Sequence, residues 1–162
     1  MRDDYNIEEK DDERTFNNEL TPDCENRILP VVEYLGEFKA LIDACGQVSY
    51  HFNMKKFVSA DINKAKKIAS AYHHDAQYYT QQLNEWRVKA RRSYAIVGFH
   101  AARLGFQMPN ENDFLNSLVI SKDRRAAYKG YLDTCLKKEE PLSPCELETK
   151  FQCRLKKRLN KA

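Results

Sequence analysis

The chain has 162 residues, of which 42% are hydrophobic and 31% are charged. No uninterrupted apolar run approaches the ~20 residues of a membrane-spanning helix, and the acidic start MRDDYNIEEKDDER is unlike a secretory signal. We therefore expect a cytoplasmic protein without integral membrane contact. The five cysteines include no CxxC pair, which favours reduced thiols that pack as small hydrophobes. The presence of only 5 Gly and 5 Pro favours helices over a turn-rich β fold.

Charge divides the chain into two parts. Residues 1–30 hold ten acidic and four basic residues, a net charge of −6, whereas residues 31–162 hold fourteen and twenty-three, a net charge of +9. Residues 1–20 have no apolar periodicity, so we predict an acidic, disordered N-terminal arm over 1–20 and a single helical domain over 21–162. The asymmetry indicates a polyanionic partner or an arm that shields a basic face; a merely solvated tail is the simpler alternative.

The first predicted helix starts near Ile28, where apolar residues begin to recur every three or four positions as far as Cys45. Pro30 would mark its start or kink it, and Gly46 is a typical C-terminal stop. Residues 47–58 fit either a short helix or a connection.

The most regular pattern of the chain follows. It visits, in steps of three or four, Ile62, Ala65, Ala69, Tyr72, Ala76, Tyr79, Leu83, Trp86, Ala90, Ser93, Val97, His100 and Leu104. This heptad-like spacing predicts one long central helix of about 40 residues, with a break near residues 73–75 as the alternative.

Capping signals predict the later helices. Asn110 or Asn112 precedes one apolar face, Ser121 precedes another, and the sequence from Ser143 to Glu146 forms a capping box with proline at the first helical position. The sequence thus predicts an all-α fold, a bundle of four to six helices around one long central helix.

The aromatic part of the long pattern suggests a surface for a partner. Its rings and small residues suit close packing against another helix, from this chain or from a second one. Our first hypothesis is a non-catalytic adaptor or regulatory protein that binds a macromolecule, with a protein partner or self-association favoured. The candidate contacts are Tyr72, Tyr79, Leu83 and Trp86.

Basic residues suggest a second hypothesis, RNA binding. Guanidinium groups hold phosphates, and interleaved tyrosines stack on unpaired bases, although an ordinary solvated helix face gives the same pattern. The candidates are Arg87, Arg91, Arg92, Arg103, Arg124 and Arg125.

The segment RRSYAIVGFHAARLGF, within residues 87–106, resembles a helix of the HEPN ribonuclease superfamily, in which an Arg is followed by a His in a similar context. The resemblance implies metal-independent RNA cleavage with Arg92 and His100 as the reacting pair; a core histidine is the alternative. No HExxH, ExxH, P-loop or GxSxG motif occurs. We therefore predict no metal or cofactor and favour binding over catalysis.

Overall fold

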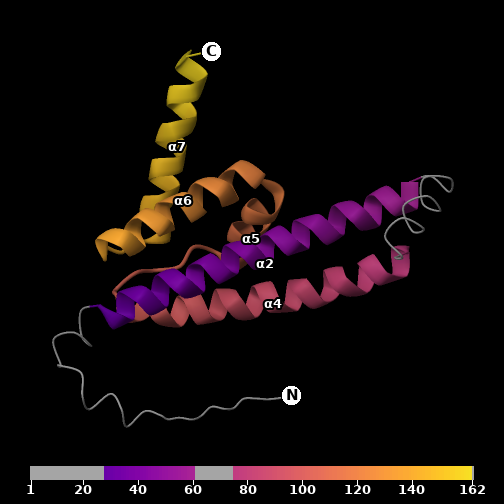
Figure 1. Ribbon diagram of the computed structural model, residues 1–162, viewed down its shortest axis with the longest axis horizontal. Helices are drawn as coiled ribbons and strands as arrows, with labels where there is room; N and C mark the ends of the chain where they lie inside the picture. The colour runs from indigo at the N-terminus through magenta and orange to yellow at the C-terminus, as the bar shows by residue number, and fades with distance from the viewer. Residues whose placement is uncertain (1–27, 61–74, 162) are drawn as a thin grey trace, which may run out of the picture.

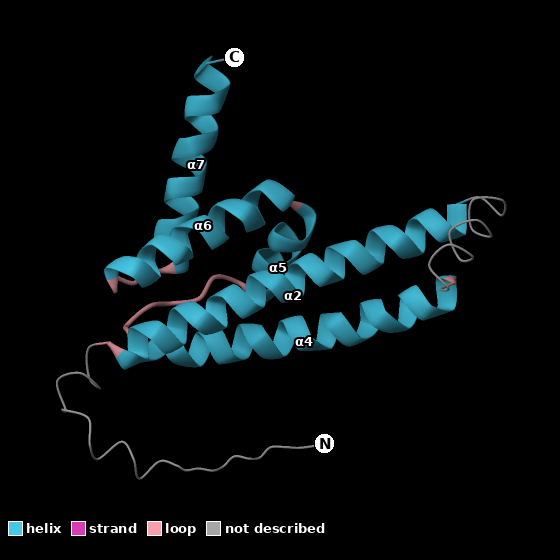
Figure 2. Ribbon diagram, in the orientation of Figure 1, coloured by secondary structure: helices cyan, strands magenta, loops and turns pink. Residues whose placement is uncertain are grey.

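The computed structural model describes residues 28–60 and 75–161, and within them it holds five helices and no strand (Figures 1 and 2). The all-α prediction is therefore confirmed, whereas the arm over residues 1–20 lies outside the described residues. The helices are α2 (Leu29–Ala60), α4 (Ala76–Arg103), α5 (Glu111–Ile120), α6 (Lys122–Lys138) and α7 (Pro144–Lys161). None of these five is long and apolar enough to cross a membrane.

The central helix is α2, which has 32 residues and packs against α4, α5 and α6. The prediction that this helix ends at Gly46 is wrong, because α2 continues to Ala60. Gly46 lies where α6 comes close: a Cβ atom built on it would be 3.4 Å from Nε of Arg125. The helix thus continues through this glycine, and the Arg125 side chain lies beside it.

Helix α4 begins at a true cap. Asp75 is extended, with φ −118° and ψ −177°, and its carboxylate accepts a hydrogen bond from the Tyr78 amide at 3.0 Å. The prediction of one continuous helix over residues 62–104 is therefore wrong, and the alternative of a break near residues 73–75 is confirmed. Residues 62–74 lie outside the described residues. At the other end, Gly105 takes a φ of +80°, a conformation that suits glycine after a helix.

Helices α2 and α4 run side by side in opposite directions and form a hairpin with two unequal halves (Figure 1). In the near half, which holds the start of α2 and the end of α4, the hairpin packs against α5, α6 and α7 around a large core. The far half consists of residues 48–60 of α2 and 76–90 of α4. Its core is a smaller cluster that includes Val48, Leu83 and Ala90.

Buried polar contacts hold the near half together. The Tyr34 hydroxyl donates to the Leu142 carbonyl oxygen at 2.9 Å and so fixes the loop before α7. The Tyr128 hydroxyl donates at 2.7 Å to the Glu148 carboxylate, which also pairs with Arg124. Burial raises the pKa of Tyr128 to about 12, so this phenol stays a protonated donor around neutral pH.

The predicted caps of the short helices are present. Asn110 accepts from the Asp113 amide at 3.1 Å, and Ser121 accepts from the Arg124 amide at 3.0 Å. Ser143 and Glu146 form both bonds of the capping box, at 3.1 and 3.2 Å. Two of the described thiols, Cys45 and Cys135, are buried as predicted, whereas Cys145 and Cys153 are exposed.

Candidate binding cleft between three helices

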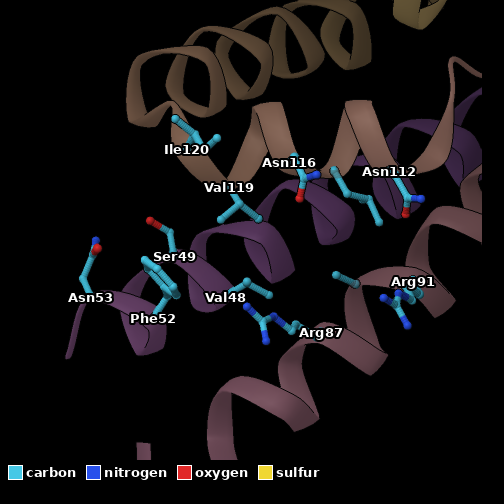
Figure 3. A pocket seen from close by; sticks show the side chains of 12 residues that line it. Val48, Ser49, Phe52, Asn53, Arg87, Arg91, Asn112, Asn116, Val119 and Ile120 are labelled. Atoms are coloured by element: carbon cyan, nitrogen blue, oxygen red, sulfur yellow. The ribbon is translucent and has the colours of Figure 1, made fainter. Parts of the chain in front are cut away.

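A cleft of about 450 Å³ opens where the large core ends, between the middle of α2, the middle of α4 and helix α5 (Figure 3). Each helix contributes several lining residues. From α2 come Val48, Ser49, Phe52 and Asn53, from α4 come Arg87, Ala90 and Arg91, and from α5 come Asn112, Leu115, Asn116, Val119 and Ile120.

The floor of the cleft is apolar. Val48, Ala90 and Leu115 are buried, and they close the bottom from α2, α4 and α5 respectively. Phe52 and Ile120 stand at the edge and remain 44% and 82% exposed. Large apolar side chains in so exposed a position, beside a ready-made apolar floor, are typical of a surface that a ligand covers.

The rim is polar and carries positive charge. Arg87 and Arg91 are one helical turn apart on α4, and both line the same side of the cleft (Figure 3). Neither forms an ion pair with another described residue. Side-chain amides of Asn53, Asn112 and Asn116 supply further donors and acceptors around the opening.

The chemistry that this lining offers is binding. The lining residues include no carboxylate, imidazole or thiol, and an arginine does not give up its proton in the neutral range. Two guanidinium groups next to an apolar floor instead match a ligand that joins an apolar group to negative charge.

Four of the six predicted basic residues form two pairs with different surroundings. Arg87 and Arg91 meet at the cleft, as described, but Arg124 and Arg125 act inside the fold. Arg125 donates 2.7 Å hydrogen bonds to the carbonyl oxygens of Leu118 and Val119, at the end of α5. Arg124 pairs with Glu148 and lies over the Phe151 ring, 4.9 Å from its centroid. These two side chains join helices to one another.

Arg92 and Arg103 lie outside the cleft. Arg103 pairs with Glu33 of α2 at 3.0 Å, and its Nη1 is 3.3 Å from Nδ1 of His100. Arg92 is exposed and precedes His100 by eight residues, about 12 Å along the axis of α4. Within one chain the nearby arginine of His100 is therefore Arg103, and the roles implied for Arg92 and His100 stay a prediction.

The predicted partner contacts lie mostly in the interior. Tyr79 and Leu83 are buried between α4 and α2, and Trp86 is partly buried against the same small cluster. Tyr72 lies outside the described residues. At these positions the side chains of α4 thus pack against α2 of the same chain.

Sequence reasoning missed much of the cleft. Phe52 and Asn53 fall in the segment that the sequence left ambiguous. Asn112, Asn116 and Ile120 come from a helix considered only for its cap and its apolar face. A helical pattern carried past Gly46 would have placed Phe52 one turn beyond Val48 and Ser49 on α2. Nothing local would have joined them to α5.

The chain matches no family model, no curated protein and no solved structure. Within residues 28–60 and 75–161, no three His, Cys, Asp or Glu side chains gather as metal ligands.

Proposed function

We propose that the protein is a non-catalytic binding protein, and that the cleft between α2, α4 and α5 holds an acidic segment of a protein partner. One observation carries the proposal: the exposed side chains of Phe52 and Ile120 flank an apolar floor directly beside the guanidinium groups of Arg87 and Arg91. A large apolar side chain of the partner fills the cleft, and neighbouring carboxylates pair with the arginines.

The size of the cleft supports a side chain as its occupant. A volume of about 450 Å³ accommodates one or two large side chains together with part of their backbone. Aromatic and aliphatic anchors in such pockets carry much of the binding energy of a protein interface. The asparagine amides at the rim suit the polar backbone groups of an inserted segment.

RNA fits this cleft less well than a peptide. A polynucleotide needs basic residues along a groove that follows its backbone and flat rings on which its bases stack. The cleft offers two arginines on one wall and a single aromatic ring, Phe52. RNA is therefore the competing occupant, and a binding experiment distinguishes it from a peptide.

Selection from a displayed library of random 12-residue peptides, with the full chain as target, tests the proposal. We expect enriched peptides to combine a large apolar residue with Asp or Glu. Their affinity should fall about tenfold or more on Arg91→Glu and on Phe52→Ala. The first change removes a partner of the carboxylates, and the second removes an apolar contact of the large side chain. Fluorescence anisotropy with a labelled selected peptide measures this.

Arg92→Glu is the matched control, because it makes the same charge change at the next residue, away from the cleft. It should leave peptide affinity within about twofold of the parent protein. Peptides that bind all three variants like the parent would refute the proposal. A single-stranded RNA that binds in an Arg91-dependent manner, when no peptide is enriched, would assign the cleft to RNA instead.

A further inference from the structure

Helix α7 carries a second charged surface, made of residues that do not line the cleft. Between Thr149 and Lys161 the sequence has six basic residues and no acidic one. Five of the six recur with helical spacing and share one side of α7, about 16 Å long. This basic face consists of Lys150, Arg154, Lys157, Arg158 and Lys161.

The outer part of α7 projects from the bundle. Leu147 and Phe151 are buried and dock the first half of the helix, but from Gln152 onward every described residue except the partly buried Leu155 is exposed. Figure 1 shows the C-terminal end of α7 standing clear of the other helices. Such a helix end is accessible from several sides.

The fold neutralises little of this charge. Arg158 is 3.7 Å from Asp123, but both side chains are more than half exposed, and Arg154 lies over the Tyr131 ring at 4.8 Å from its centroid. The three lysines of the basic face form no ion pair with another described residue. Exposed pairs of this kind contribute little free energy, so the face is free to meet an external anion.

We propose that the basic face of α7 binds the phosphate backbone of double-stranded DNA, and that the projecting half of the helix enters the major groove. An α-helix with its side chains is about 10–12 Å wide, and the major groove of B-form DNA is about 12 Å wide. A face with five cations along about 16 Å matches phosphates on the groove wall, and the exposed helix end leaves room for the duplex. This surface is separate from the proposed peptide cleft.

Two other polyanions fit the projecting helix less well. An anionic membrane surface needs a broad apolar face beside the cations, but Leu159 is the one large apolar side chain exposed on the described part of this helix, and there is no exposed ring. Single-stranded RNA is held largely by aromatic stacking, which the same lack of a ring disfavours. A-form RNA duplexes have a major groove too deep and narrow for a helix.

Binding of a fluorescent 20-base-pair DNA duplex to the full chain, measured at several salt concentrations, tests the proposal. We expect the affinity to fall steeply with salt. In the triple variant Lys150→Gln, Lys157→Gln, Lys161→Gln, it should drop about tenfold or more at low salt. The slope of log K against log salt should become shallower by about 3, because each lost phosphate contact contributes about 0.9.

The control removes the same charge elsewhere, through Lys56→Gln, Lys89→Gln and Lys137→Gln, at exposed positions on α2, α4 and α6. It should lower the slope by less than about 1. Equal effects of the two triple variants, or tighter binding of single-stranded RNA than of duplex DNA, would overturn the proposal. So would loss of binding to phosphatidylserine vesicles in the α7 variant with unchanged DNA affinity. Peptide binding at the cleft should be the same in both triple variants. The experiment therefore tests DNA binding by α7 independently of peptide binding by the cleft.

Discussion

The near and far halves of the α2–α4 hairpin are made from the same two helices, yet they differ in what covers them. In the near half, α5, α6 and α7 bury the apolar side of the hairpin, and Tyr34 and Arg125 bind loop and helix-end carbonyl groups. Among the described residues of these three helices, Val119 of α5 is the one that packs against the small cluster of the far half. The cleft lies at the boundary between the two halves. A partner bound there would therefore cover part of the hairpin next to α5.

Two pairs of arginines also differ in their surroundings. Arg124 and Arg125 of α6 look like a basic cluster in the sequence, but their guanidinium groups are used up by Glu148 and by carbonyl groups of α5. Arg87 and Arg91 have no such partner among the described residues. A basic residue is therefore a candidate for binding only after the groups around it are known.

The largest expected effect compares one substitution in the two halves. Leu41 and Leu83 are both almost fully buried, the first in the near half and the second in the far half. We expect Leu41→Ala to lower the free energy of unfolding by about 4–5 kcal/mol and Leu83→Ala by about 2–3 kcal/mol. The smaller cost follows because two helices collapse onto a cavity more easily than five. Urea denaturation followed by circular dichroism measures both.

Equal costs at Leu41 and Leu83 would show that the far half is as firmly packed as the near half. Val88→Ala is the surface control; this side chain is 54% exposed, and its truncation should change stability by less than about 1 kcal/mol.

The next effect separates the two arginine pairs. We expect Arg125→Ala to lower the free energy of unfolding by about 1–3 kcal/mol, because two carbonyl groups at the end of α5 lose a charged donor. Arg91→Ala should change it by less than about 0.5 kcal/mol, since this side chain is exposed and unpaired in the described structure. Thermal unfolding of the two variants gives the comparison. A similar loss for both would place Arg91 among the structural residues and weaken the proposed role of the cleft.

The sequence predicted those features that depend on a few neighbouring residues. Asn110, Ser121 and the pair Ser143 and Glu146 cap helices because each side chain reaches an amide three residues away, a relation visible in the sequence. The all-α class followed from periodicity and from the scarcity of turn residues. At residue 75 a local cap overrides a pattern that continues across it, and pattern alone could not decide between the two.

The missed features depend on distant contacts. Helix α2 continues past Gly46 because the residues beyond it are packed: Val48, His51 and Val58 are buried. The cleft combines α2, α4 and α5 in a way that no spacing within one helix encodes. The arginine candidates were named as a group, but their division into structural and accessible pairs required the positions of Glu148 and of the α5 carbonyl groups.

The smallest expected effect concerns the attachment of α7 to the near half. Ser143→Ala removes the hydroxyl that accepts from the Glu146 amide, and it should lower the free energy of unfolding by about 1 kcal/mol. Amide exchange should become faster in the first turn of α7, next to the buried Leu147, and stay unchanged in α4. Thr149→Ala, an exposed change six residues later, should cost less than about 0.5 kcal/mol. If the first turn of α7 keeps its protection in the Ser143 variant, packing of Leu147 and Phe151 alone holds the helix in place, and the cap then adds nothing to the stability of the near half.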